Sequence, residues 1–158
     1  MKNRLFILMI LFPLLAFGQE EAIQKSAHDI SQHYAALPVL YHFDGVQKEQ
    51  LSDKITRQYV MGAQSMIVKW TLLKGAVVPL HFHPNEQITW ITKGSVKVVS
   101  QGKEFIVKAG DVFIIPPYVP HVFYALEDTI DIDYFTPVRQ DWLNNSAGYI
   151  QSIQKKSS

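Results

Sequence analysis

The chain has 158 residues, and its 15 lysines and arginines nearly balance its 14 aspartates and glutamates. With 47% hydrophobic and 18% charged residues, its composition is that of a folded globular protein, which excludes intrinsic disorder and fibrous repeats. A net charge of +1 gives no electrostatic basis for binding nucleic acid or an anionic membrane surface. The absence of cysteine excludes disulfides, thiolate metal sites and a cysteine nucleophile.

Residues 1–18 have the composition of a secretory signal peptide. Lys2 and Arg4 precede an apolar run of 13 residues, which is too short to span a bilayer, and small residues stand at the positions expected before cleavage at Gln19. We therefore predict an exported protein, periplasmic or secreted, without a membrane segment after cleavage. An uncleaved membrane anchor is the alternative.

Residues 19–45 are predicted to form a helical extension. Apolar residues recur at intervals of three and four from residue 22 to residue 37, and Pro38 ends the pattern. His28 and His33 are five residues apart and do not share a helix face, so we assign them no function.

Beyond residue 46 the hydrophobic pattern is typical of strands. Short β-forming runs are separated by turn signals that contain glycine, and these runs are Met66–Leu73, Ile88–Ile91, Val96–Val99, Phe105–Val107, Val112–Ile115, Val119–Tyr124 and Thr129–Phe135. Short strands without intervening helices indicate an all-β fold, an antiparallel sandwich or barrel over residues 46–143. Residues 144–158 are expected to form a short helix or a coil tail.

Three histidines are candidates for metal binding. His81 and His83 are separated by one residue, so in a strand both imidazoles point to the same face and can reach one ion. His121 follows a segment rich in proline that precedes another predicted strand. If His81 and His83 are considered alone, the alternative to metal binding is that both lie on the surface and form hydrogen bonds.

The spacing of glycines around these histidines resembles the two motifs of the cupin superfamily. In the first motif Gly75 and Gly94 flank the histidine pair and an amide, and in the second Gly110 precedes His121. The resemblance covers about residues 66–135. It implies a small antiparallel β-barrel, or jelly roll, that binds one divalent transition metal (Ni, Zn, Mn or Fe) through His81, His83, Gln87 and His121.

The fourth metal-ligand position departs from the usual pattern of the superfamily, because this chain has Gln87 where a ligating glutamate is common. An amide leaves the ion its full charge, which strengthens it as a Lewis acid and disfavours oxygen chemistry. Glu86 has the opposite strand parity and would be the ligand only if the strand bulges at this point.

Acidic and aromatic residues share one face of the last predicted strand. Asp131, Asp133 and Phe135 alternate along it, and such a combination suits the wall of a pocket. The alternative is that both carboxylates are solvated on the outer face.

The run Asp133-x-Phe135-Thr136-Pro137-x-Arg139-x-Asp141-Trp142 resembles the KdgF family of small cupins, which ketonise 4,5-unsaturated monouronates from pectin or alginate breakdown. The resemblance implies that Asp133, Arg139 and Phe135 are catalytic and that Arg139 and Phe135 also bind the substrate, a small acidic sugar. Further candidates for stacking on the sugar are Trp90, Tyr118 and Phe123, for which a plain core role is the alternative. The export signal and the helical extension are not features of that family.

From these residues we expect a metal-dependent enzyme in which Arg139 binds a carboxylate and Asp133 transfers a proton. The metal then acts as a Lewis acid. An iron-dependent cupin dioxygenase and a non-catalytic binding protein for small molecules are the alternatives. A homodimer that pairs through sheet edges is a further expectation.

Overall fold

The computed structural model describes residues 37–155. The predicted signal peptide and most of the predicted helical extension, including His28 and His33, lie outside the described residues. Residues 37–40 are exposed, have no regular secondary structure and belong to a separate unit from residues 41–158.

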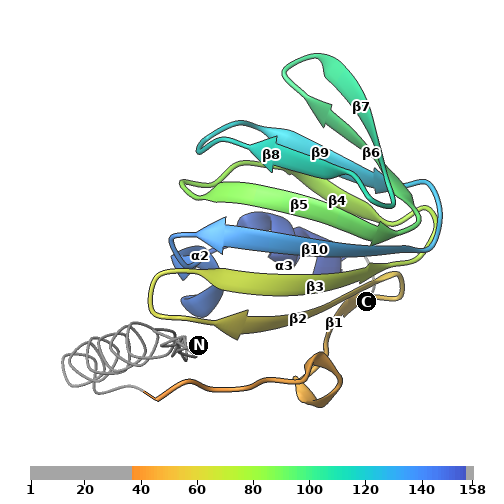
Figure 1. Cartoon of the computed structure of the whole chain (residues 1–158). Coiled ribbons are helices and arrows are strands. Elements are labelled where there is room, and N and C mark those ends of the chain that lie inside the picture. The colour runs from red at the N-terminus through yellow and green to blue at the C-terminus, as the bar shows by residue number, and fades with distance from the viewer. Residues whose placement is uncertain (1–36, 156–158) are drawn as a thin grey trace, which may run out of the picture. The chain divides into compact units, whose positions relative to one another are not determined.

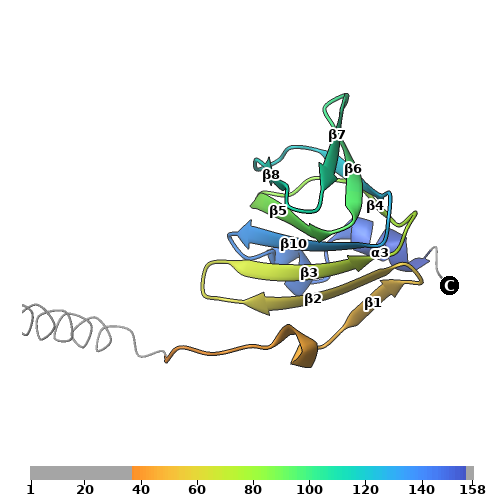
Figure 2. The ribbon, with the colours of Figure 1, turned by 45° about the vertical axis from the view of Figure 1, so that its right-hand side comes forward.

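The described residues of the second unit form two antiparallel sheets that face each other as a jelly roll (Figures 1 and 2). The strand order is β1-β2-β3-β10-β5-β8 in one sheet and β4-β9-β6-β7 in the other. The all-β fold predicted from the sequence is therefore confirmed. The bounds are β1 (Glu49–Ser52), β2 (Ile55–Met61), β3 (Met66–Leu72), β4 (Val77–His81), β5 (Glu86–Lys93), β6 (Ser95–Ser100), β7 (Lys103–Lys108), β8 (Val112–Ile115), β9 (His121–Ala125) and β10 (Thr129–Thr136).

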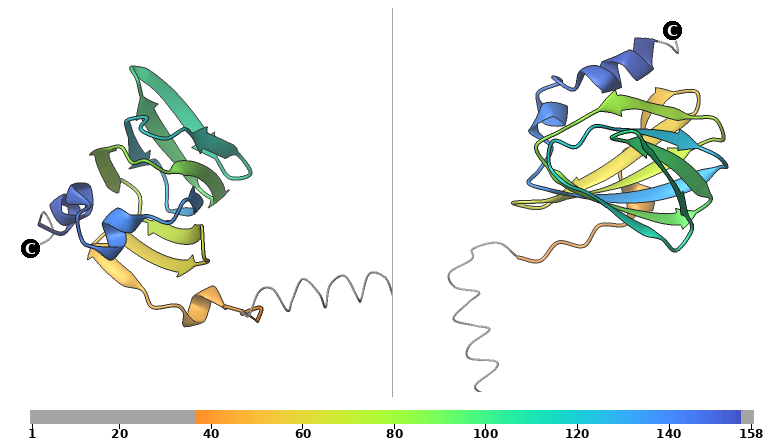
Figure 3. Two further views of the ribbon diagram at one scale, coloured as in Figure 1. Left: turned by 90° about the vertical axis from the view of Figure 1, so that its left-hand side faces the viewer. Right: turned by 90° about the horizontal axis from the view of Figure 1, so that it is seen from above.

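Helices are short in the described part of the chain. They are the 3₁₀ helix η1 (Phe43–Gly45), α2 (Gln140–Leu143) and α3 (Gly148–Lys155). None of them is long and apolar enough to cross a bilayer. After β10 the chain runs through α2 to α3, which packs against β4 and β1 (Figure 3).

Three strands, β1, β2 and β4, do not follow a clear sequence pattern. In β2 the polar side chains of Arg57 and Gln58 are buried, which obscures the alternation of polar and apolar residues. Strand β4 contains Pro79, which cannot donate a backbone hydrogen bond and is tolerated because β4 lies at a sheet edge. Its pairing with β9 is irregular between Val78 and His81.

The turn from β5 to β6 carries the chain from one sheet to the other. Gly94 occupies this turn with a φ of 77°, in the left-handed region. A Cβ atom at this position would lie 2.5 Å from the carbonyl oxygen of Asp128, so only glycine fits without displacement of the backbone.

Much of the space between the sheets is apolar, and buried polar side chains of β5, β9 and β10 interrupt it. Val68, Ile91 and Val98 are fully buried and typify the apolar part. The inward face of β10 contributes the polar residues Asp131 and Asp133 to the same interior. The fold therefore places two carboxyl groups inside the barrel.

Candidate active site

The three candidate histidines lie together at one end of the barrel. His81 ends β4 and is the direct cross-strand partner of His121, the first residue of β9. His83 follows in the connection to β5. One nitrogen from each ring lies within 4.8 Å of the others. This cluster can hold a metal ion.

The hydrogen bonds of the cluster assign the same tautomer to all three rings. Each Nδ1 lies 2.8–3.0 Å from a backbone carbonyl oxygen, and these carbonyls belong to Pro79, Asn85 and Val119 for His81, His83 and His121, respectively. A carbonyl only accepts, so each Nδ1 carries the hydrogen and each Nε2 keeps its lone pair. Nitrogen lone pairs of this kind are what a metal ion needs.

Burial also keeps the cluster uncharged. It lowers the pKa of His81 to about 2, with a further contribution from His121, and it lowers the pKa of His83 to about 4. Burial is the main reason that the pKa of His121 is lowered as well. Neutral imidazole is the form that binds metals, so the cluster is in its binding form at neutral pH.

Acceptor atoms without a donor in the cluster show whether a cation fits. The Nε2 atom of His121 is buried without a hydrogen-bond partner. The Nε2 atom of His83, which carries no hydrogen in this tautomer, lies 3.1 Å from Oε1 of Gln87, another acceptor. A cation among these atoms would satisfy all of them. The residues present therefore fit a divalent metal ion.

The side chain of Gln87 is held in a defined orientation. Its Nε2 atom donates to Oδ1 of Asp133 and to the hydroxyl of Thr89, both at 2.9 Å, which directs Oε1 toward His83. Glu86 is exposed on the other face of β5, as strand parity predicts. The structure thus brings Gln87, rather than Glu86, to the histidine cluster.

Asp133 is buried and accepts hydrogen bonds at both oxygens. Trp70 donates to Oδ2 at 2.8 Å, while Thr89 and Gln87 donate to Oδ1 at 2.5 and 2.9 Å. Burial raises the pKa of Asp133 to about 6, against the opposing effect of these hydrogen bonds. Asp131 is 2% exposed on the same inward face. Neither carboxyl group is solvated on the outer face.

Arg139 is completely buried just beyond β10. Its Nε and Nη2 atoms donate to the two carboxylate oxygens of Asp141 at 2.9 and 2.7 Å, and the guanidinium lies over the rings of Trp142 and Phe135. Its Nη1 atom has no hydrogen-bond partner. Asp141 and the rings fix the guanidinium, and Nη1 remains available to an anionic group.

Several of these side chains line one pocket between the sheets. One part of its wall is polar and the other part is apolar. The polar lining is His81, Gln87, Asp131, Asp133, Arg139 and Tyr149, and the apolar lining is Trp70, Leu72, Val78, Phe123 and Phe135. Phe123 and Phe135 thus lie in the pocket wall, and their contact with a substrate stays a prediction.

Trp90 and Tyr118 do not line this pocket. Trp90 is 50% exposed because it follows the buried Thr89 on β5 and so points away from the interior. Tyr118 is 64% exposed in the loop before β9, where its φ is 63°. Neither ring therefore lies in the wall of this pocket, and stacking of either ring on a sugar stays a prediction.

Tyr149 on α3 is a pocket residue that the sequence did not reveal. Its ring stacks on His81 with a centroid distance of 3.8 Å, and its hydroxyl accepts hydrogen bonds from Trp142 and Arg139. Tyr149 and His81 also line an open pocket at the surface beside α3. The two rings therefore lie between the interior pocket and this surface pocket. The sequence predicted a short helix or a coil tail here and gave no sign of this contact.

Comparisons with known proteins agree with the fold. The Cupin domain family matches residues 68–135. The pectin degradation protein KdgF of Dickeya dadantii (strain 3937) is 34% identical over 98 residues, which cover 60% of this chain and 89% of that protein.

Solved structures lead to the same group of proteins. KdgF from Halomonas sp. is 29% identical with a TM-score of 0.62, and the match covers 66% of this chain and 99% of that one. An RmlC-like cupin from Shewanella frigidimarina is 28% identical with a TM-score of 0.62, over 67% of this chain and 96% of that one. The chain therefore belongs to the cupin superfamily and, within it, to the family of the pectin degradation protein KdgF.

Proposed function

We propose that this protein converts 4,5-unsaturated monouronates into linear 4-deoxy-5-keto uronates. The observation that carries the proposal is the shared pocket, which is lined by buried Arg139 with its unpaired Nη1, by Asp133 and by His81 of the histidine cluster. The similarity to KdgF, a pectin degradation protein, supports an acidic sugar as the substrate.

The reaction is an isomerisation that needs a base, an acid and a site for an anion. The substrate ring carries a carboxylate on C5 beside the C4=C5 double bond. Loss of the proton from the C1 hydroxyl breaks the bond between C1 and the ring oxygen, and C1 becomes an aldehyde. The electron pair passes to the ring oxygen as an enolate, which becomes the C5 ketone when C4 gains a proton. No oxidant is consumed.

The residues of the pocket match these requirements. Arg139 offers Nη1 to the substrate carboxylate, and Phe135 forms the adjacent wall. Asp133, whose two oxygens accept hydrogen bonds from three fixed donors, is the base that takes the proton from the C1 hydroxyl. A divalent metal held by the three histidines and Gln87 would supply Lewis acidity near the developing negative charge.

The direct test uses the metal-loaded chain from Gln19 onward and the unsaturated monouronate released by a pectate lyase or an alginate lyase. We expect rapid loss of the absorbance of the double bond, at the same rate with and without oxygen, and the linear keto product in the NMR spectrum. Loss no faster than the spontaneous rate, with metal bound, would overturn the proposal. Oxygen-dependent turnover would instead indicate a dioxygenase.

The anion site is tested by Arg139→Lys. Lysine keeps the positive charge, but it lacks the planar guanidinium whose several N–H donors can bind Asp141 and the substrate at the same time. We expect KM to rise by about 10- to 100-fold, which corresponds to the loss of a charge-assisted hydrogen bond.

Arg57→Lys is the matched control for this change. The guanidinium of Arg57 is also buried, binds Glu49 of β1, lies over Trp142 and has an unpaired Nη1, but Arg57 does not line the pocket. Its replacement is expected to leave KM unchanged. Equal changes of KM in both variants would contradict a substrate contact at Arg139.

A further inference from the structure

Asp131 is a second buried carboxyl group in the same pocket, and the role given to Asp133 does not use it. The two residues are two positions apart on β10 and therefore project from the same face of the strand. Their hydrogen bonds differ. Asp133 accepts from three donors, whereas Oδ1 of Asp131 is buried without any partner. An unpaired buried carboxylate is costly, but a protonated carboxyl group avoids most of that cost.

The surroundings of Asp131 favour its neutral form. The side chains across the neighbouring strands and in the adjoining pocket wall are apolar or aromatic, namely Trp70 and Leu72 of β3, Val78 of β4, Ile91 of β5 and Phe123 of β9. The ionisable groups that line the same pocket are Asp133, His81, Arg139 and Tyr149. Burial raises the pKa of Asp131 well above its ordinary value, and the negative charge of Asp133 raises it further.

We propose that Asp131 is the catalytic acid of the isomerisation, the group that delivers the proton to C4, while Asp133 is the base. This assignment rests on the function proposed above. When the surroundings of two carboxyl groups keep one protonated and the other ionised, the pair supplies the acid and the base that one proton shift requires. The polar pocket wall thus offers both groups from a single strand.

The proton balance closes within the pair. Asp133 gains the proton lost by the C1 hydroxyl as the bond from C1 to the ring oxygen breaks, and Asp131 loses its proton to C4 as the ketone forms. Asp131 is then ionised and Asp133 protonated. Transfer of one proton from Asp133 to Asp131, directly or through a water molecule, restores the starting state without any other reactant.

The kinetic test is Asp131→Asn, which keeps the shape of the side chain and removes the acidic proton. We expect kcat to fall by about 100-fold or more, with KM and bound metal unchanged. The wild type should lose kcat/KM at alkaline pH as Asp131 ionises, and the variant should lack this decline. Asp53→Asn, at an exposed turn, is the matched control and should keep both kcat and the pH profile.

The outcomes separate this inference from the proposed function. An active wild type with an equally active Asp131→Asn variant would overturn the acid assignment alone, whereas an inactive wild type would overturn the proposed reaction. A fall in kcat that accompanies a lower Tm and an unchanged pH profile would place Asp131 in the packing of the barrel, which also overturns the assignment.

A spectroscopic measurement covers the case in which the variant does not fold. Infrared spectra of wild-type protein labelled with ¹³C-aspartate, recorded without substrate near neutral pH, should contain the carbonyl band of a protonated carboxylic acid. This band should disappear at alkaline pH. Its absence at neutral pH would overturn the proposal that Asp131 holds a proton in the resting protein.

Discussion

Replacing His121 by alanine is expected to abolish both stable metal binding and turnover. His121 is fully buried beside His81, and its unpaired Nε2 atom is one of the nitrogen ligands available to an ion. Elemental analysis should find about one metal ion per wild-type chain and far less in the variant. Activity on the unsaturated uronate should fall to the spontaneous rate.

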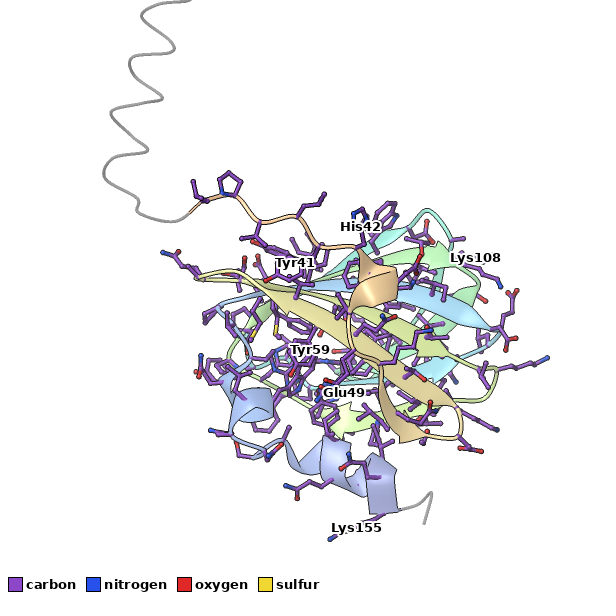
Figure 4. All side chains as sticks on the ribbon, turned by 90° about the horizontal axis from the view of Figure 1, so that it is seen from below. Tyr41, His42, Glu49, Tyr59, Lys108 and Lys155 are labelled. Atoms are coloured by element: carbon purple, nitrogen blue, oxygen red, sulfur yellow. The ribbon has the colours of Figure 1, made fainter. Side chains whose placement is uncertain are left out.

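A thermal measurement tests the same site without any substrate. Bound metal stabilises the folded chain by about 2.7 kcal/mol at a free metal concentration of 100 Kd, so Tm should rise on addition of metal to the wild type and not to His121→Ala. His42→Ala is the control, because His42 is exposed next to η1 (Figure 4) and should keep the metal and the increase in Tm. Full metal occupancy in His121→Ala would remove the site assignment.

Replacing Asp133 by asparagine is expected to lower kcat by about 100- to 10,000-fold, the range associated with loss of a general base. Asparagine cannot ionise, and its amide nitrogen cannot accept the hydrogen bonds that Trp70, Gln87 and Thr89 donate to the carboxylate. Stopped-flow absorbance of the double bond measures the chemical step.

The same variant distinguishes an enzyme from a binding protein. Titration calorimetry with the unsaturated uronate should give similar affinities for the wild type and Asp133→Asn, while the product forms only with the wild type. Asp53→Asn should behave like the wild type in both experiments. A value of kcat within a few-fold of wild type for Asp133→Asn would show that Asp133 is not the base.

The sequence predicted the parts of the fold and site that follow from local spacing. Two histidines separated by one residue were expected on one face of a strand, and the structure brings His81, His83 and the distant His121 together, although His83 lies just beyond the end of β4. The alternation of Asp131, Asp133 and Phe135 also holds, because β10 is regular over these residues. Alternation does not show which face of a strand is buried. The sequence alone therefore did not decide whether both carboxyl groups lie inside or outside the barrel.

The remaining differences arise from tertiary contacts. Trp90 is aromatic and adjacent to buried Thr89, but parity places its ring on the outer face of β5. Tyr149 lies 68 positions after His81, and only the path of the chain through α2 and α3 stacks the two rings. The hydrogen bonds that distinguish Asp133 from Asp131 come from β3 and β5, so neither sequence position reveals them.

The amide of Gln87 makes positions 87 and 133 interdependent. Its oxygen, an acceptor, faces His83, and its nitrogen, a donor, binds the carboxylate of Asp133. One planar amide group therefore supplies both contacts. A glutamate at position 87 would set one carboxylate oxygen against another at about the present 2.9 Å separation, and one of the two acids would have to take up a proton. Redesign of this barrel toward an acidic ligand set would therefore also change the protonation of the pair, so positions 87 and 133 would have to be varied together.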